Sequence, residues 1–349
     1  MRFNTVVETY ENDMSIIRTK TRFILLIVLF IILVALPFFA GEHIINFITM
    51  LAVTLIAVHG LNIILGFCGE ITVAQAAFLG IGAYGYAVFT ELGVPWVFAM
   101  FAAILLAGIC GVIFGLPALR VKGFYLLMVS LGAQFIILWV FSHWKSVTGG
   151  LVYGKAVPVA SIFGFAIDTG LRKYLLIIAV TVLMTFLVNC IYRSKLGRAF
   201  VAIRDNDLAA EAMGINVFGY KLFAFFLSAI FAGVAGCMWA ISVSHLFPDH
   251  FSLMESIWYV AMLIVGGMGT ISGAIFGTIF WAILTECSVI YGPQFGELLP
   301  SNLGVAAGTS LGSIVFAIVI VLFLIFEPRG LKNLWGKVKK YFELYPFRQ

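Results

Sequence analysis

Charged residues are scarce in this sequence of 349 residues. Only 11% of them are Asp, Glu, Lys or Arg, whereas a soluble globular domain carries about 25%. Hydrophobic residues make up 62% of the chain, and many lie in apolar runs long enough to cross a hydrocarbon core of about 30 Å as helices. These runs also lack the two-residue alternation of membrane β-strands. The composition therefore excludes a soluble domain and predicts an all-α polytopic membrane protein.

Residue sets for catalysis and metal binding are missing as well. The sequence has no HExxH motif, no Ser/His/Asp set and no cluster of Asp, Glu and His inside an apolar run. Its five cysteines form no CxxC pair and have no histidine at ligand spacing. We therefore expect no metal and no cofactor, and these absences argue against a membrane enzyme and against proton-driven transport.

Two strings resemble nucleotide-binding motifs, and neither meets the requirements. GGLVYGKA (149–156) has Ala156 where a P-loop needs a Ser or Thr for Mg²⁺. GIGAYG (80–85) lies inside an apolar run and not at a turn between a strand and a helix. Close helix packing explains these glycines better, with a subunit interface or a pathway wall as the alternative. The same holds for the glycines spaced four apart: Gly111 and Gly115, Gly273 and Gly277, and Gly304, Gly308 and Gly312.

The apolar runs predict about ten spans, with both termini in the cytoplasm. Residues 1–22 are then a cytoplasmic N-terminal segment, residues 23–327 the transmembrane domain and residues 328–349 a basic cytoplasmic tail. This topology places 17 of the 21 Lys and Arg residues in the cytoplasm, as the positive-inside rule requires. Residues 145–170 are expected to form an extramembrane loop. The expected spans are 23–40, 44–65, from the break near 66–70 to 90, 95–119, 124–142, 174–192, 217–243, 251–265, 271–290 and 303–326.

Residues 194–215 are the one long polar segment in the middle of the chain. We expect an amphipathic helix in water here, because apolar positions recur at helical spacing while the charges lie elsewhere. Either the segment offers its surface to a soluble partner, or it is a solvated connector, as charge runs in membrane proteins usually are. The expected stripe comprises Phe200, Ile203, Asp207, Ala210 and Gly214.

Two glycine-rich breaks interrupt the apolar runs, at 66–69 and at 266–273, in the two halves of the chain. Discontinuous helices in corresponding halves point to a transport pathway, because unwound backbone is tolerated only beside a cavity or inside protein. Tight turns between ordinary spans are the alternative. The candidate pathway residues are Gly66, Gly69, Glu70, Thr72, Gln75, Gly266, Gly267 and Gly269.

Several strings in order along the chain resemble one known family. They are LNIILGFCGEITVAQAAFLGIGAYGYAV (61–88), ALRVKGFYLLMVSLG (118–132), TGG (148–150), SKLGRAFVAIRDNDLAAEAMGI (194–215), IVGGMGTISGAIFG (264–277) and EPRGL (327–331). Together they resemble the permease subunit of LIV-type ABC importers, which take up branched-chain amino acids. The long Arg-Asp-Asn-Asp loop (204–207) resembles the "M" type of the two permeases that such importers pair.

The resemblance implies a fold similar to the type II ABC importers and a position in a bacterial or archaeal cytoplasmic (inner) membrane. It implies three kinds of partner besides lipid: a second homologous permease, two cytosolic ATPase subunits that bind ATP, and an extracytoplasmic solute-binding protein. Residues 194–215 would then be the coupling helix that docks on an ATPase subunit. The residues expected to serve coupling are Arg198, Arg204, Asp205, Asp207, Glu211, Ala212 and Gly214.

The chain departs from the family pattern at two positions. Where the family has Gly-Gln and Gly-His, this sequence has Gly69-Glu70 and Ala74-Gln75. An added carboxylate and a missing histidine near a candidate pathway leave urea, short amides and small organic acids open as substrates. An ion-coupled secondary transporter is the alternative from another class, although the apolar runs contain almost no residues able to bind a coupling ion.

Overall fold

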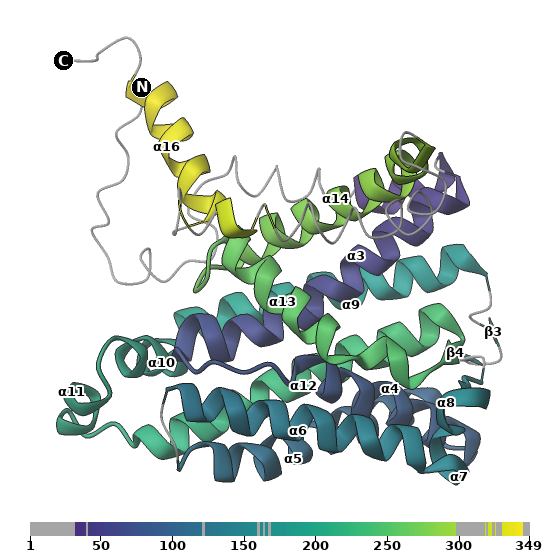
Figure 1. Ribbon diagram of the computed structural model, residues 1–349, viewed down its shortest axis with the longest axis horizontal. Coiled ribbons are helices and arrows are strands. Elements are labelled where there is room, and N and C mark those ends of the chain that lie inside the picture. The colour runs from purple at the N-terminus through teal and green to yellow at the C-terminus, as the bar shows by residue number, and fades with distance from the viewer. Residues whose placement is uncertain are drawn as a thin grey trace.

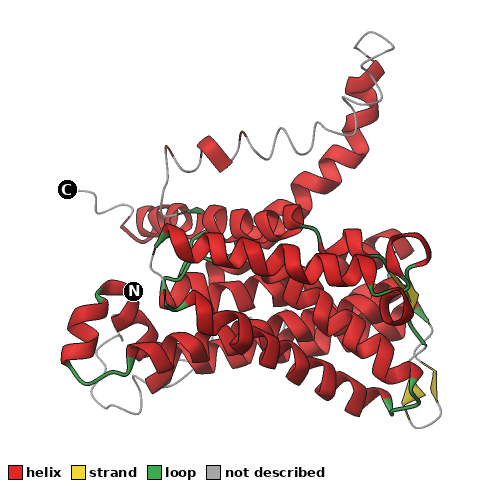
Figure 2. Cartoon of the chain, turned by 60° about the horizontal axis from the view of Figure 1, so that its bottom comes forward, coloured by secondary structure: helices red, strands yellow, loops and turns green. Residues whose placement is uncertain are grey.

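The computed structural model describes residues 32–39, 41–120, 123–158, 161–162, 165–166, 169–297, 318, 320–322, 325 and 330–344. Helices form almost all of the described chain, and the few strands lie together at one end (Figure 2). The N-terminal segment at 1–22, most of the expected span at 23–40, nearly all of that at 303–326, and the glycines at 304, 308 and 312 lie outside the described residues.

The principal helices pack side by side, with shorter elements at the two ends of the bundle (Figure 1). The longer helices are α3 (Glu42–Leu61), which continues into the π-helix η2 (Asn62–Cys68), α4 (Gln75–Glu91), α5 (Trp96–Ala118), α6 (Phe124–His143), α9 (Gly170–Arg193), α12 (Val217–Val243), α13 (Leu253–Gly266), α14 (Ile271–Glu297) and α16 (Leu331–Leu344). The shorter ones are η1 (Leu36–Phe38), α7 (Lys145–Thr148), α8 (Gly150–Tyr153), α10 (Lys195–Asp205), α11 (Asp207–Ala212) and η3 (Pro248–Phe251).

Five helical stretches are long and apolar enough to cross a membrane: Glu42–Cys68, Trp96–Ala118, Phe124–His143, Gly170–Arg193 and Val217–Val243. They confirm, by length and composition, the spans expected at 44–65, 95–119, 124–142, 174–192 and 217–243. Helix α4 lies where the third span is expected, but its 17 residues make it shorter than these five.

The spans expected at 251–265 and 271–290 correspond to α13 and the 27-residue α14, which meet at a sharp bend. Pro248–Gly266 and Ile271–Cys287 together satisfy the length and composition of a span, with a bend of 118° between them. Helix α13 has 14 residues, so it rises only about 21 Å. Gly267 and Gly269, with φ of +115° and +73°, allow the bend because a residue with a Cβ rarely adopts these angles. The described residues therefore hold five candidate spans, or six if the bent pair is one.

Helix α12 forms the centre of the bundle and packs against α3, α4 and α5. Its glycines allow the backbones of α12 and α4 to approach closely. A Cβ built on Gly236 would lie 2.8 Å from Ala83 N, and one built on Gly82 would lie 2.6 Å from Gly233 Cα. In lipid, helices associate through such close dispersion contacts, because the acyl chains are as apolar as the side chains and the hydrophobic effect does not drive helices together. The expectation that the glycines of 80–85 serve helix packing is confirmed.

The other described pairs of glycines also serve packing between helices. Gly111 and Gly115 of α5 face α12, where a Cβ on Gly115 would lie 3.1 Å from Phe225 Cβ. Gly277 of α14 faces α13, where a Cβ would lie 2.9 Å from the carbonyl carbon of Met262. These contacts confirm the packing expectation for both pairs.

Short strands mark the end of the bundle opposite α10 and α11 (Figure 1). Strand β1 (Lys155–Ala156) pairs antiparallel with β4 (His245–Leu246), which follows α12. Strands β2 (Ser161–Ile162) and β3 (Phe165–Ala166) pair in the same way. Lys155 also forms an ion pair with Glu91 at the end of α4. The described part of 145–170 thus consists of short elements, in agreement with the expected loop.

Candidate functional site

The polar segment forms two helices and not the single helix expected from the sequence. Helix α10 ends at Asp205 and α11 begins at Asp207, while Asn206 between them is extended, with φ −162° and ψ 108°. The Asn206 side chain accepts a hydrogen bond from Ala209 N at 3.1 Å and so caps α11. A short side chain that bonds its own backbone favours caps over helix interiors, which explains the interruption.

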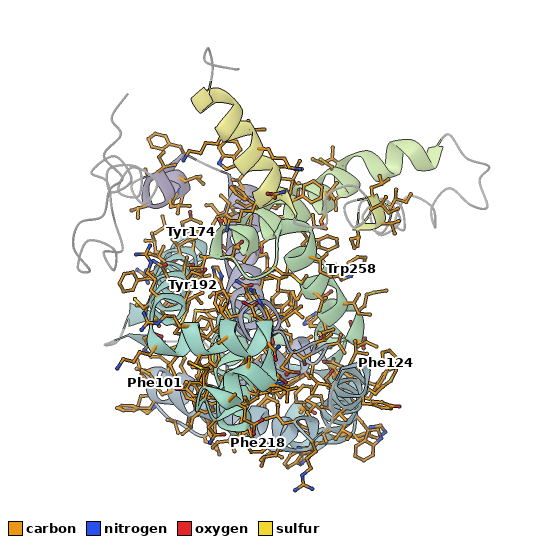
Figure 3. The ribbon with its side chains drawn as sticks, turned by 90° about the vertical axis from the view of Figure 1, so that its left-hand side faces the viewer. Phe101, Phe124, Tyr174, Tyr192, Phe218 and Trp258 are labelled. Carbon is orange, nitrogen blue, oxygen red and sulfur yellow. The ribbon has the colours of Figure 1, made fainter. Side chains whose placement is uncertain are left out.

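The apolar stripe of the segment is the part that holds it to the bundle. Phe200, Ile203 and Ala210 are buried, as expected, and α10 packs against η2, α9 and α12. Asp207 is half-buried. Gly214 lies beyond α11 with φ of +83°, where it ends the helix and is exposed. Figure 3 faces this end of the bundle, with Tyr192 of α9 and Phe218 of α12 labelled near the two helices.

The opposite face of the segment is open and carries most of the residues expected to serve coupling. Arg198, Asp205, Glu211, Ala212 and Gly214 are all exposed. Sequence reasoning missed two large apolar side chains among them, Leu208 at 73% and Met213 at 84% relative exposure. Both are apolar residues that lie outside the buried stripe of the polar segment, and this position was the sequence signal that could have identified them.

The two glycine-rich breaks, 200 residues apart in sequence, contact each other. Asn62 of η2 joins them, because its Nδ2 donates to the Thr270 carbonyl at 3.2 Å and its Oδ1 accepts from Gly269 N at 3.0 Å. Gly66 lies against the same point, where a Cβ would be 2.6 Å from Gly269 N. The first interruption runs from Gly69 to Ala74, so Gly66 lies inside the helix and not at the break itself.

Arg204 of the polar segment reaches this junction. Its Nη1 donates a hydrogen bond to the Gly66 carbonyl at 2.9 Å. A Cβ on Gly69 would lie 2.6 Å from Arg204 Cγ, and one on Gly269 would lie 2.8 Å from Arg204 Nη1. The guanidinium also pairs with Asp205 at 3.2 Å. One side chain of the polar segment therefore contacts both breaks.

The second break also contacts the residue that precedes α16. A Cβ on Gly330, in the EPRGL string, would lie 2.6 Å from Gly267 N. Gly266 faces the backbone of α14, where a Cβ would be 2.7 Å from Gly277 N. Gly266, Gly267 and Gly269 are all buried. The candidate pathway glycines of this half thus pack against protein in this conformation.

Thr72, in the first interruption, and Gln75, the first residue of α4, are buried as well. Gln75 Nε2 donates to the Ala57 carbonyl at 2.9 Å, and its Oε1 accepts from Ser228 Oγ at 3.1 Å. The N–H groups of this turn are satisfied by side chains of neighbouring helices, which the unwound backbone requires inside a membrane protein. Val73 N donates to Ser130 Oγ, Ala76 N to Ser256 Oγ and Ala77 N to Gln134 Oε1, at 3.2, 2.9 and 3.1 Å.

Glu70, the remaining candidate pathway residue, forms an ion pair with Lys221 of α12. From the sequence, Lys221 is a residue near the end of a span with an ordinary interfacial position. The structure instead places its ammonium group between Glu70 and Asp207, whose Oδ2 lies 2.8 Å from Lys221 Nζ. The added carboxylate at Glu70 therefore has a partner inside the chain.

A helical bundle with several candidate spans, in which a polar segment contacts two interrupted helices, has the organisation of a membrane transport subunit. The chain belongs to the family described as "Branched-chain amino acid transport system / permease component", which matches residues 43–324. It is therefore a multi-pass permease component of an ABC transport system, a transport subunit that works with ATPase and binding-protein partners.

Curated relatives agree with this family. The chain is 28% identical, over 91% of its length and 76% of the relative's, to the high-affinity branched-chain amino acid transport system permease protein LivM of Escherichia coli. It is 21% identical to a probable LivM permease of Methanocaldococcus jannaschii, over 67% of each chain. A nucleoside ABC transporter permease of Lactococcus lactis, NupC, is 27% identical over 48% of this chain and 50% of its own. No solved structure matches the chain.

Proposed function

We propose that this permease carries branched-chain or other hydrophobic amino acids across a bacterial or archaeal cytoplasmic membrane. An extracytoplasmic binding protein delivers the substrate, and two cytosolic ATPase subunits supply the energy. A second homologous permease completes the pathway, in a type II importer-like assembly with about ten spans per permease and both termini in the cytoplasm. In this proposal residues 23–327 form the permease domain, between the cytoplasmic segments 1–22 and 328–349.

One observation carries the coupling part of the proposal, namely the contact of Arg204 with both helix breaks. The segment 194–215 has an exposed face suited to a soluble partner and a buried face fixed to the bundle. If an ATPase displaced the segment, Arg204 would move with it and would shift its contacts with Gly66, Gly69 and Gly269. Discontinuous helices of this kind commonly form the site around which a transporter alternates its access.

The ion pair of Glu70 supports amino acids over the smaller polar substrates. A carboxylate in the first break would favour a different substrate if it lined the pathway without a partner. Because Lys221 neutralises Glu70, this departure from the family pattern has an explanation that does not involve the substrate.

Uptake by the assembled complex tests the substrate. We expect proteoliposomes containing both permeases, the ATPases and the binding protein to accumulate radiolabelled leucine, isoleucine and valine when ATP is present inside. Accumulation should be lost without ATP or without the binding protein. Uptake of urea or a short amide in place of leucine would contradict the substrate assignment, and uptake driven by an ion gradient alone would support the secondary-transporter alternative.

Binding of the ATPase tests the docking face. Replacing Leu208 and Met213 by aspartate puts two charges on the exposed side of the segment and leaves Phe200 and Ile203 in place. Truncating one of the few hot-spot residues at the centre of an interface costs about 2 kcal/mol or more, and an aspartate there also buries a charge, so we expect co-purification of the ATPase to fall at least about tenfold.

Val152→Asp is the matched control for this experiment. Val152 is 80% exposed and lies in α8, at the other end of the bundle. It should leave ATPase binding unchanged. Equal loss in both variants would mean that the added charge acts on folding, and full binding by the Leu208→Asp/Met213→Asp variant would place the docking face elsewhere.

A further inference from the structure

Lys221 holds two carboxylates at the end of the bundle that carries the polar segment. Its Nζ lies 2.8 Å from Asp207 Oδ2 and forms a second ion pair with Glu70. The side chains of Lys221 and Glu70 are 11% and 13% exposed, and that of Asp207 is 27% exposed. We call these three residues the charge triad.

The charge triad joins three separate parts of the chain. Glu70 lies in the interruption between η2 and α4, next to Gly69. Asp207 is the first residue of α11, in the water-facing segment. Lys221 lies in the second turn of α12, the central helix of the bundle. A single ammonium group therefore connects the coupling segment, the first helix break and the central helix.

Electrostatics make this connection depend on the positions of all three groups. A largely buried carboxylate is costly unless an opposite charge or a hydrogen bond stabilises it. The interaction falls with distance and is less screened here than at an open surface. If α11 moved away with Asp207, Lys221 would keep Glu70 and lose its second partner, whereas a joint movement would keep both pairs.

The triad is also separate from the contact made by Arg204. Arg204 belongs to α10 and bonds the Gly66 carbonyl on one side of Gly69. Asp207 belongs to α11 and reaches Glu70, on the other side of Gly69, through Lys221. Each of the two short helices therefore has its own polar connection to the first break.

We propose that Lys221 is a positioning residue for energy coupling, which links the movement of α11 to the first helix break through Asp207 and Glu70. This inference rests on the proposed docking of the segment on an ATPase, and it assigns Glu70 to the coupling machinery instead of the substrate pathway. The carboxylate at Glu70 and the carboxylate at Asp207 are thus used together, as the two ends of one link.

Three variants separate a link from simple neutralisation of charge. Lys221→Met leaves Glu70 and Asp207 without their shared cation and is expected to lower stability as well as transport. Lys221→Met with Glu70→Gln removes the most buried carboxylate too, so it relieves the buried charge without restoring the link. Lys221→Arg keeps the charge and is expected to retain transport.

The readout is the amount of substrate imported per ATP hydrolysed, measured in proteoliposomes with the loaded binding protein. We expect the Lys221→Met/Glu70→Gln variant to fold, to retain its ATPase and to hydrolyse ATP. Import per ATP should fall about tenfold, because coupling between two sites typically changes an equilibrium by a factor of this order. Lys155→Met is the matched control, because it breaks a Lys–Glu ion pair at the opposite end of the bundle. It should leave the ratio unchanged.

The import-per-ATP measurement has three outcomes that count against the proposals. Normal import per ATP in the Lys221→Met/Glu70→Gln variant would show that the triad only neutralises buried charge, and it would overturn the proposal. An equal fall in the Lys155→Met control would overturn it as well, because the effect would not be specific to the coupling end. If the unmodified chain retained no ATPase, the proposed function itself would fail, which is a distinct outcome from uncoupling by the variants alone.

Discussion

Replacing Gly236 by leucine is expected to remove most of the folded protein from the membrane. Gly236 lies on α12 where this helix meets the backbone of α4, and a Cβ there would be 2.8 Å from Ala83 N. A neighbouring backbone cannot rotate away as a flexible side chain can, so the helices must separate. Overpacking of this kind costs about 1–3 kcal/mol or more, and Gly82 and Gly233 at the same crossing would lose their contacts too.

The yield of monodisperse protein after detergent extraction, measured by size-exclusion chromatography, reports this effect. Gly132→Leu is the matched control, because Gly132 is also helical but has no atom within 4 Å of an added Cβ. We expect the control to match the unmodified chain in yield. A normal yield of the Gly236→Leu variant would contradict the close crossing of α4 and α12 described here.

Replacing Arg204 by alanine is expected to uncouple import from ATP hydrolysis. The substitution removes the hydrogen bond to the Gly66 carbonyl and the packing on Gly69 and Gly269. A hydrogen bond from a charged group contributes about 1.5–3 kcal/mol, so import should fall by a factor of about ten to one hundred. Because Phe200 and Ile203 still hold α10, the protein should remain folded and bind its ATPase.

Import and ATP hydrolysis measured side by side in proteoliposomes test this expectation. Arg120→Ala serves as the comparison, since Arg120 is an exposed arginine in the turn after α5, outside the coupling segment. Both variants lose a positive charge, and only the Arg204 variant should lose import. Unchanged import by the Arg204→Ala variant would mean that the segment acts on the breaks by another route.

Much of the structure of the polar segment could be predicted from the sequence. The spacing of Phe200, Ile203 and Ala210 defines its buried face, and the structure buries all three. The division at Asn206 could not be predicted, because a residue that favours helix caps is also common in exposed parts of ordinary helices. The roles of the exposed residues in docking stay a prediction.

The glycine-rich breaks were also visible in the sequence, whereas their contact was not. Local patterns show that the chain is interrupted near Gly69 and Gly267, but they carry no information on which interruptions meet. The hydrogen bonds of Asn62 to Gly269 and Thr270 join residues more than 200 positions apart. Lys221 is a similar case, since its partner Glu70 lies 151 positions away and the local sequence shows only a lysine near the end of a span.

Asn206 divides the polar segment into two helices. Regular helical hydrogen bonding ends on one side of it, where Asn206 N donates to Ala202 O at 3.1 Å, and resumes on the other, where Ala210 N donates to Asn206 O at 3.0 Å. Because Asn206 interrupts the helix, the direction of α11 is not fixed as a continuation of α10. It is set by the cap at Asn206 and by the packing of α11 on α10 and α12.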